Sequence, residues 1–146
     1  YAPQEEYLIE LGKGDIKRSG KDVTLIAWSN MIPRSLEAAE QLAREGIETE
    51  IVDPRTLVPL DVDLILASVR KTEHVVIVQE AVRRGGVASD IASIIQAEAF
   101  DFLDAPIELA AGLNTPIPYN EALERACVPQ VEDIVRAVKR AVYAEI

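Results

Sequence analysis

The sequence predicts an α/β domain in which a mostly parallel sheet lies between two layers of helices. Short apolar runs rich in valine and isoleucine alternate along the chain with stretches of helical periodicity, and the connections between them are short. Strands that alternate with helices pair in parallel, because right-handed crossovers place the helices on both faces of the sheet. The 146 residues and the 49% apolar content suffice for one contiguous core.

The first half of the chain contains two predicted strand and helix pairs. Residues 7–11 have the composition of a short extended segment, and a buried strand is predicted over 23–28. A helix over 35–45 follows, and Gly46 ends it. Residues 47–52 partly alternate between apolar and polar, which predicts a second strand. The next helix begins after Asp61, a good N-cap residue.

The second half continues this alternation. Residues 74–80 form a nearly continuous apolar run, as expected of a central parallel strand that is covered on both faces. A third helix follows Gly86, and another strand is predicted over 107–111. The last helix is predicted to begin at Pro129, because proline suits the first helical position and because acidic residues start the helix and basic residues end it.

Composition limits the classes of partner. With 25 acidic and 15 basic residues, the formal charge of −10 repels phosphate backbones and anionic lipid headgroups. No apolar run approaches the roughly 20 residues that cross a bilayer, so the chain is expected to be soluble. The single cysteine, Cys127, cannot form an internal disulfide, which fits a reducing compartment.

The domain is expected to occupy residues 21–146, after an interdomain linker and lead-in segment over 1–20. The chain opens with the polar, proline-bearing stretch YAPQEE and has no initiator methionine, a composition typical of linkers. We therefore expect a fragment of a longer polypeptide.

Sites in parallel sheets gather outside the carboxyl ends of the strands. The loop after the first buried strand, SNMIP, contains none of the glycines that a dinucleotide fold needs there. The chain also contains neither a phosphate-cradling loop followed by lysine and serine or threonine nor a nucleophile elbow. These three enzyme classes are therefore excluded.

Two carboxylates stand at predicted strand ends. Asp53 has the position of a phosphoacceptor in a flavodoxin-like receiver, but Trp28 occupies the place where acidic metal ligands are needed, so we favour a structural role such as pairing with Arg55. Glu80 has the position of a general base. We favour instead that it accepts backbone amides near Gly86, at the start of the next helix.

The only histidine, His74, and Cys127 form a nucleophile and base only if the fold brings them together. We favour a strand-entry role for His74 and a small apolar role for Cys127. The spacing of these two residues fits no zinc site.

The charge distribution is uneven in the second half of the chain. Between Gly85 and Glu124 the chain has no lysine or arginine but has seven acidic residues: Asp90, Glu98, Asp101, Asp104, Glu108, Glu121 and Glu124. Uncompensated carboxylates on one face attract a basic partner. The alternative is that these residues scatter over an ordinary solvated surface.

Four segments resemble one family in the right order along the chain. They are GKDVTLIA at 20–27, DPRTLVPLD at 53–61, FLDAPI at 102–107 and TPIPY at 115–119. The sequence resembles the transketolase-type carboxy-terminal domain, as found in beta subunits of pyruvate, branched-chain 2-oxo acid and acetoin dehydrogenases. The resemblance implies a three-layer α/β/α domain with a five-stranded mixed sheet.

The resemblance also implies an assembly and partner-docking domain of a thiamine-diphosphate-dependent enzyme. That enzyme decarboxylates a 2-oxo acid and reductively acylates a lipoyl group, and it acts in the bacterial or archaeal cytoplasm or the mitochondrial matrix. The family holds thiamine diphosphate and magnesium between the alpha subunit and the preceding domain of the beta subunit. No catalytic, cofactor-binding or metal-binding residue is therefore expected within this chain.

The partners that the resemblance implies are the alpha subunit, a second beta subunit in an alpha2-beta2 heterotetramer, and the basic peripheral subunit-binding domain of the dihydrolipoyl acyltransferase. Asp104 matches the family aspartate that meets an arginine of this last partner, so Asp104, with Asp101 and the terminal Ile146, is expected to bind it. Two rival interpretations stay open: a fragment of another transketolase-family enzyme, and a free-standing flavodoxin-like binding or signalling module.

Overall fold

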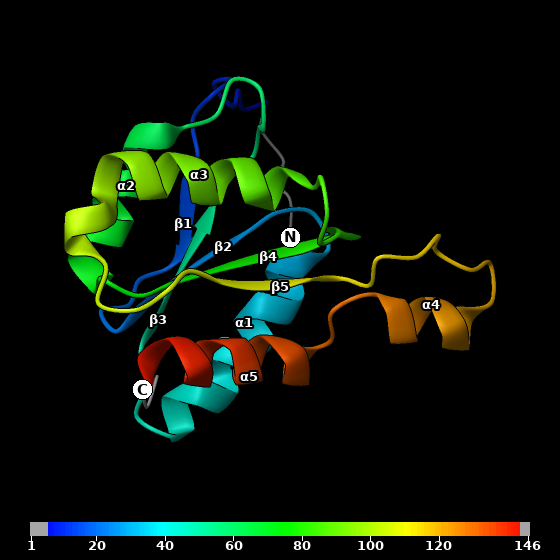
Figure 1. Ribbon diagram of the computed structural model, residues 1–146. Helices are drawn as coiled ribbons and strands as arrows, with labels where there is room; N and C mark the ends of the chain where they lie inside the picture. The colour runs from blue at the N-terminus through cyan, green and yellow to red at the C-terminus, as the bar shows by residue number, and fades with distance from the viewer. Residues whose placement is uncertain (1–5, 144–146) are drawn as a thin grey trace.

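The computed structural model describes residues 6–143, which fold into a five-stranded sheet between two layers of helices (Figure 1). The helices α1 and α5 cover one face of the sheet, and α2 and α3 cover the other. The elements are β1 (Asp15–Arg18), β2 (Val23–Ala27), α1 (Met31–Arg44), β3 (Thr49–Asp53), α2 (Val62–Thr72), β4 (Val75–Val82), α3 (Val87–Ala99), the 3-10 turn η1 (Phe100–Phe102), β5 (Glu108–Gly112), α4 (Glu121–Cys127) and α5 (Val131–Val142).

The sheet has the strand order β1-β3-β2-β4-β5 and is mixed. The strands β3, β2, β4 and β5 are parallel, whereas β1 pairs with β3 in the antiparallel direction. All five residues of the central strand β2 are buried, because helices cover both of its faces. The predicted three-layer α/β/α fold with a mostly parallel five-stranded sheet is confirmed.

Side chains of successive strand residues point to opposite faces of the sheet and so fill two separate cores. Leu25 and Val76 pack against α1 and α5. Ile26, Val75 and Ile77 pack against α2 and α3. This division explains why the strands are nearly continuous apolar runs rather than alternating ones.

Three predicted elements differ from the structure. The segment 7–11 is exposed and forms no strand; the edge strand is β1, within the predicted linker 1–20, and its sequence DIKR has little apolar signal because its side chains are largely solvent-accessible. The helix α1 begins at Met31 rather than at residue 35, since Pro33 in its first turn needs no amide partner.

The third difference lies at the last helix. The helix α5 begins at Val131 instead of Pro129, because Gln130 is its N-cap residue and donates its amide to Asp133 at 2.8 Å. The periodicity also does not predict η1 and α4, which are short and contain no buried residue.

Replacing Asp61 by alanine is expected to lower the free energy of unfolding by about 1–2 kcal/mol. Its carboxylate accepts the amide of Gly14 at 2.9 Å and, as the N-cap of α2, the amide of Leu64 at 3.2 Å. The hydrogen bond from Gly14 is the main reason why the pKa of Asp61 lies below its usual value. Urea denaturation measures the loss. The control is Asp63→Ala, which removes another negative charge from the first turn of α2. If it lost as much free energy of unfolding, the charge near the helix start would explain the effect, and not the hydrogen bonds of Asp61.

Candidate docking surface

The carboxylate of Asp53, at the end of β3, makes local interactions. It accepts the backbone amide of Arg55 at 2.9 Å, and its other oxygen lies 3.6 Å from the ammonium nitrogen of Lys17 on β1. Asp53 thus closes the turn after β3 and ties the edge strand to its neighbour.

Gln79, rather than Glu80, joins β4 to the start of α3. Its side-chain oxygen accepts the amide of Ala88 at 3.0 Å, and its nitrogen donates to the carbonyl of Val82 at 3.0 Å. The expected role of Glu80 is therefore wrong, and the strand alternation gives the reason. Residues 75, 77 and 79 face the layer that contains α3, whereas Glu80 faces the layer of α1 and α5.

His74 and Cys127 lie at opposite ends of the parallel strands. His74 precedes β4, and its Nδ1 lies 3.0 Å from the carbonyl oxygen of Thr72. Cys127 ends α4, and its carbonyl accepts the amide of Leu113 just after the carboxyl end of β5. The fold therefore does not bring them together as a nucleophile and base.

No group of three or more histidine, cysteine or acidic side chains within residues 6–143 is arranged to hold a metal ion. Over the same residues, no helix has the length and apolar character that crossing a membrane requires.

Asp101 lies in η1, directly after α3, and Asp104 follows η1 by two residues. Both side chains are exposed, and so are the rings of Phe100 (61%) and Phe102 (44%). The guanidinium of Arg70 lies 5.5 Å from the centre of the Phe102 ring. We call this region the docking surface; its cavity is lined by Gln96, Phe100, Leu103, Asp104, Ala105 and Pro106.

The docking surface is held to the body through the backbone. The amide of Asp104 donates to the carbonyl of Glu73 at 3.1 Å, at the end of α2. Glu73 in turn lines a hollow together with Val142 and Tyr143 at the end of α5. Ile146 lies outside the described residues.

The seven acidic residues of 85–124 do not form one face. Glu108 pairs with Arg140 at 2.9 Å, and Asp90 lies in the first turn of α3. Glu121 and Glu124 lie on α4, beyond the carboxyl end of β5, whereas the docking surface precedes the amino end of β5. Asp101 and Asp104 belong to the docking surface, and the exposed Glu98 lies beside it in the last turn of α3.

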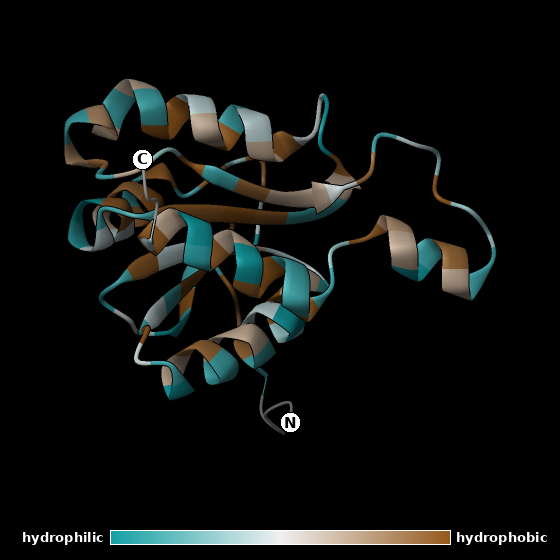
Figure 2. Cartoon of the chain, turned by 60° about the horizontal axis from the view of Figure 1, so that its bottom comes forward, coloured by the Kyte–Doolittle hydropathy of each residue, from teal (hydrophilic) through white to brown (hydrophobic). Residues whose placement is uncertain are grey.

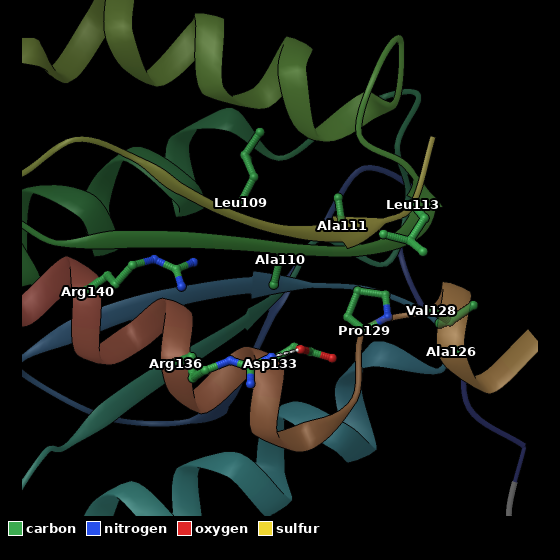
Figure 3. Close-up of a pocket in the computed structure, with 10 residues that line it drawn as sticks. All are labelled: Leu109, Ala110, Ala111, Leu113, Ala126, Val128, Pro129, Asp133, Arg136 and Arg140. Atoms are coloured by element: carbon green, nitrogen blue, oxygen red, sulfur yellow. Dashed lines mark hydrogen bonds and ion pairs between the residues drawn. The ribbon is translucent and has the colours of Figure 1, made fainter. Parts of the chain in front are cut away.

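A second exposed region is the segment 113–127, which we call the arm. It carries α4 away from the rest of the molecule, as both views show (Figures 1 and 2). Beside the arm lies a groove between β5 and α5 (Figure 3). Its lining is apolar except for Asp133, Arg136 and Arg140.

Comparison with known proteins places the chain in a family. Residues 12–134 match the family model described as the transketolase C-terminal domain. The chain belongs to this family. It is 46% identical over 142 residues to the pyruvate dehydrogenase E1 component subunit beta-1, mitochondrial, of Arabidopsis thaliana, covering 97% of the chain and 39% of that protein.

Two bacterial proteins are also similar to the chain. The acetoin:2,6-dichlorophenolindophenol oxidoreductase subunit beta of Bacillus subtilis is 46% identical over 91% of the chain and 39% of its own length. The pyruvate dehydrogenase E1 component subunit beta of the same organism is 41% identical, over 94% of the chain and 42% of its own length. The chain thus spans about two fifths of these relatives.

Solved structures agree with this fold. A protein described as "Split gene transketolase, inactive beta4 tetramer" superposes with a TM-score of 0.82 at 31% identity, over the whole chain and 46% of that protein. A 2-oxoglutarate:ferredoxin oxidoreductase from Magnetococcus marinus superposes with a TM-score of 0.61, over 89% of the chain and 20% of that protein. At 18% identity, this second similarity concerns the fold alone.

Proposed function

We propose that this chain is the assembly and partner-docking domain of the beta subunit of a thiamine-diphosphate-dependent 2-oxo acid dehydrogenase. The observation that carries the proposal is its similarity, over more than 90% of its length, to beta subunits of pyruvate dehydrogenase and of an acetoin oxidoreductase. The intact enzyme decarboxylates a 2-oxo acid and passes the acyl group to a lipoyl group. The relatives include mitochondrial and bacterial proteins, so it acts in the mitochondrial matrix or in the cytoplasm of a prokaryote.

Thiamine diphosphate and magnesium bind outside this domain, between the alpha subunit and the preceding domain of the beta subunit. The interactions of the residues at the carboxyl ends of β3 and β4 support this assignment, because these side chains bond to other parts of the domain. Asp53 closes a turn and pairs with Lys17, and Gln79 anchors the start of α3. These side chains stabilise the domain, and we assign catalysis to the other parts of the enzyme.

The docking surface binds the basic peripheral subunit-binding domain of the acyltransferase. Exposed phenylalanine rings give apolar contact area, and the two carboxylates beside them attract arginine or lysine. Asp104 is the better anchor, because the hydrogen bond of its amide to the carbonyl of Glu73 holds its backbone in place. The surface thus combines an apolar centre with acidic neighbours, which matches a small basic partner.

The Asp104→Ala variant is expected to bind this subunit-binding domain at least tenfold more weakly, because the loss of a hydrogen bond to a charged group costs about 1.5–3 kcal/mol and about 1.4 kcal/mol is a factor of ten. Isothermal titration calorimetry at low salt measures the dissociation constant. The matched control is Asp90→Ala, which removes an exposed aspartate from the opposite end of α3. Equal affinity of Asp104→Ala and the wild-type chain would count against the anchor role.

Self-association is the second part of the assembly role. The enzyme contains two beta subunits in an alpha2-beta2 heterotetramer, and the structural relative at 31% identity is described as a tetramer of beta chains. We therefore assign to this domain a contact with a second copy of itself, in addition to its contact with the alpha subunit.

A further inference from the structure

The ring of Phe102 lies at the surface of the domain. It belongs to η1, in which no residue is buried, and 44% of the residue is exposed. The next residue, Leu103, is partly buried and packs against the core under α2 and α3. Exposed side chains change rotamer within nanoseconds, so the ring needs a further contact if it is to keep one orientation.

Arg70 makes this contact from a different element. It lies in the last turn of α2, and its guanidinium is over the Phe102 ring, 5.5 Å from the ring centre. A guanidinium within about 6 Å of the ring centre is attracted by the negative face of the ring. The contact joins η1 to α2 through side chains, in addition to the backbone hydrogen bond from Asp104 to Glu73.

The guanidinium of Arg70 is not occupied by a carboxylate. Within residues 6–143 it forms no ion pair, although Glu73 is only three residues further along the chain. Lys71, the other basic residue of the same helical turn, pairs with Glu50. The charge of Arg70 is thus directed to the aromatic ring.

Charge alone would make Arg70 unfavourable for docking. The docking surface carries Asp101 and Asp104, and a basic partner is attracted by these carboxylates and repelled by a cation beside them. Holding the ring of Phe102 has the opposite effect, because a side chain that is already ordered loses less entropy when the partner binds. The two effects predict opposite signs for the loss of Arg70, so an experiment can separate them.

We propose that Arg70 is a positioning residue of the docking surface, whose guanidinium holds the Phe102 ring in the orientation that apolar side chains of the partner contact. Arg70 acts through this ring and not through its own charge. The inference rests on the proposed function, to which it adds how the apolar part of the docking surface is ordered before the partner binds.

Isothermal titration calorimetry of the chain with the subunit-binding domain tests this role. Arg70→Met removes the charge but keeps an unbranched apolar side chain, and it is expected to bind about two- to fivefold more weakly, as the loss of an exposed cation–π contact predicts. Arg70→Lys keeps a cation and is expected to recover most of the affinity. In a Phe102→Leu background, Arg70→Met is expected to change the affinity by less than about twofold, because the ring is already gone.

The matched control is Arg44→Met. Arg44 is an exposed arginine in the last turn of α1, and it makes no ion pair with another described residue. The control removes one positive charge from the same kind of helix position, so it reports the change in net charge and in the interaction with the helix dipole. It is expected to leave the affinity unchanged. Thermal unfolding shows whether each variant folds.

NMR spectroscopy of the isotope-labelled chain tests the ring contact without the partner. The side-chain protons next to the Arg70 guanidinium are expected to resonate further upfield in the wild-type chain than in Phe102→Leu, because they lie over the face of the ring. Absence of this difference would overturn the inference. So would an Arg70→Met variant that binds the partner as tightly as the wild-type chain or more tightly. A wild-type chain that does not bind the subunit-binding domain at all would overturn the proposed function itself, so the two failures give different results.

Discussion

The Gly20→Ala variant is expected to lose about 3 kcal/mol of its free energy of unfolding, which is the upper end for overpacking by one methyl group. A Cβ atom at position 20 would lie 2.2 Å from the carbonyl carbon of Thr49 and 2.3 Å from the amide nitrogen of Glu50. Both atoms belong to the backbone of β3, which is buried and paired on both sides, so they cannot move away. The turn must therefore shift as a whole.

That turn also holds three hydrogen bonds to β3 and the residue before it. The amides of Lys21 and Asp22 both donate to the carbonyl of Glu48 at 3.0 Å, and the amide of Gly20 donates to the carboxylate of Glu50 at 3.3 Å. A shift of the turn weakens all three of them. The expected loss thus combines steric overlap with weakened hydrogen bonds.

Urea denaturation measures the effect, with Gly46→Ala as the control. Gly46 has a φ of +86°, but a Cβ atom there would meet no atom within 4 Å. The control is therefore expected to lose only about 1–2 kcal/mol, from backbone conformation. If both variants lost the same amount, close approach to β3 would not be what requires glycine at position 20.

The Glu50→Ala variant is expected to lose about 2–3 kcal/mol, because it removes the acceptor at the centre of a buried network. The Glu50 side chain is almost completely buried, with 1% exposure. It accepts hydrogen bonds from Ser68 at 2.6 Å and from Lys71 and the Gly20 amide. Ser68 bonds in turn to Thr24 at 2.7 Å, so the network joins β3 and β2 to α2.

The control for this prediction is the neighbouring Glu48→Ala. Its carboxylate pairs with Arg18 at 3.0 Å and is 44% exposed, and exposed pairs contribute about 1 kcal/mol or less. Urea denaturation at pH 7 compares the two variants. If Glu48→Ala lost as much free energy of unfolding as Glu50→Ala, burial of the network would not explain the loss.

The same network predicts how stability depends on pH. Burial raises the pKa of Glu50, but the hydrogen bonds from Lys71 and Ser68 outweigh burial and hold the pKa below its usual value. The ionised carboxylate therefore stabilises the folded state above the unfolded-state pKa of about 4.3. This stabilisation is lost as the pH falls from there through the folded-state pKa. The wild-type chain should lose more stability over this range than Glu50→Gln.

The docking surface and the arm lie beyond opposite ends of β5. Asp101 and Asp104 precede the strand, and the arm follows it. The docking surface and the arm therefore occupy different parts of the domain.

Local patterns in the sequence were sufficient to predict the three layers of the fold. Continuous apolar runs such as 74–80 are typical of strands that are covered on both faces, and helical periodicity located α2, α3 and α5. The edge strand β1 and the helix α4 were not predictable in this way. The side chains of β1 are partly or fully exposed and α4 buries none of its residues, so their sequences carry no apolar period.

The sequence by itself determined the fold class and the family, because burial imposes a periodicity on the residues and the family has four recognisable segments. Only the tertiary structure decided which polar side chains meet. It placed α3 over the face that carries Gln79 and not Glu80, and it separated His74 from Cys127 by the length of the strands. It also divided one acidic stretch between two surfaces. Such contacts depend on which strands are neighbours and which face each helix covers, and spacing along the chain does not contain that information.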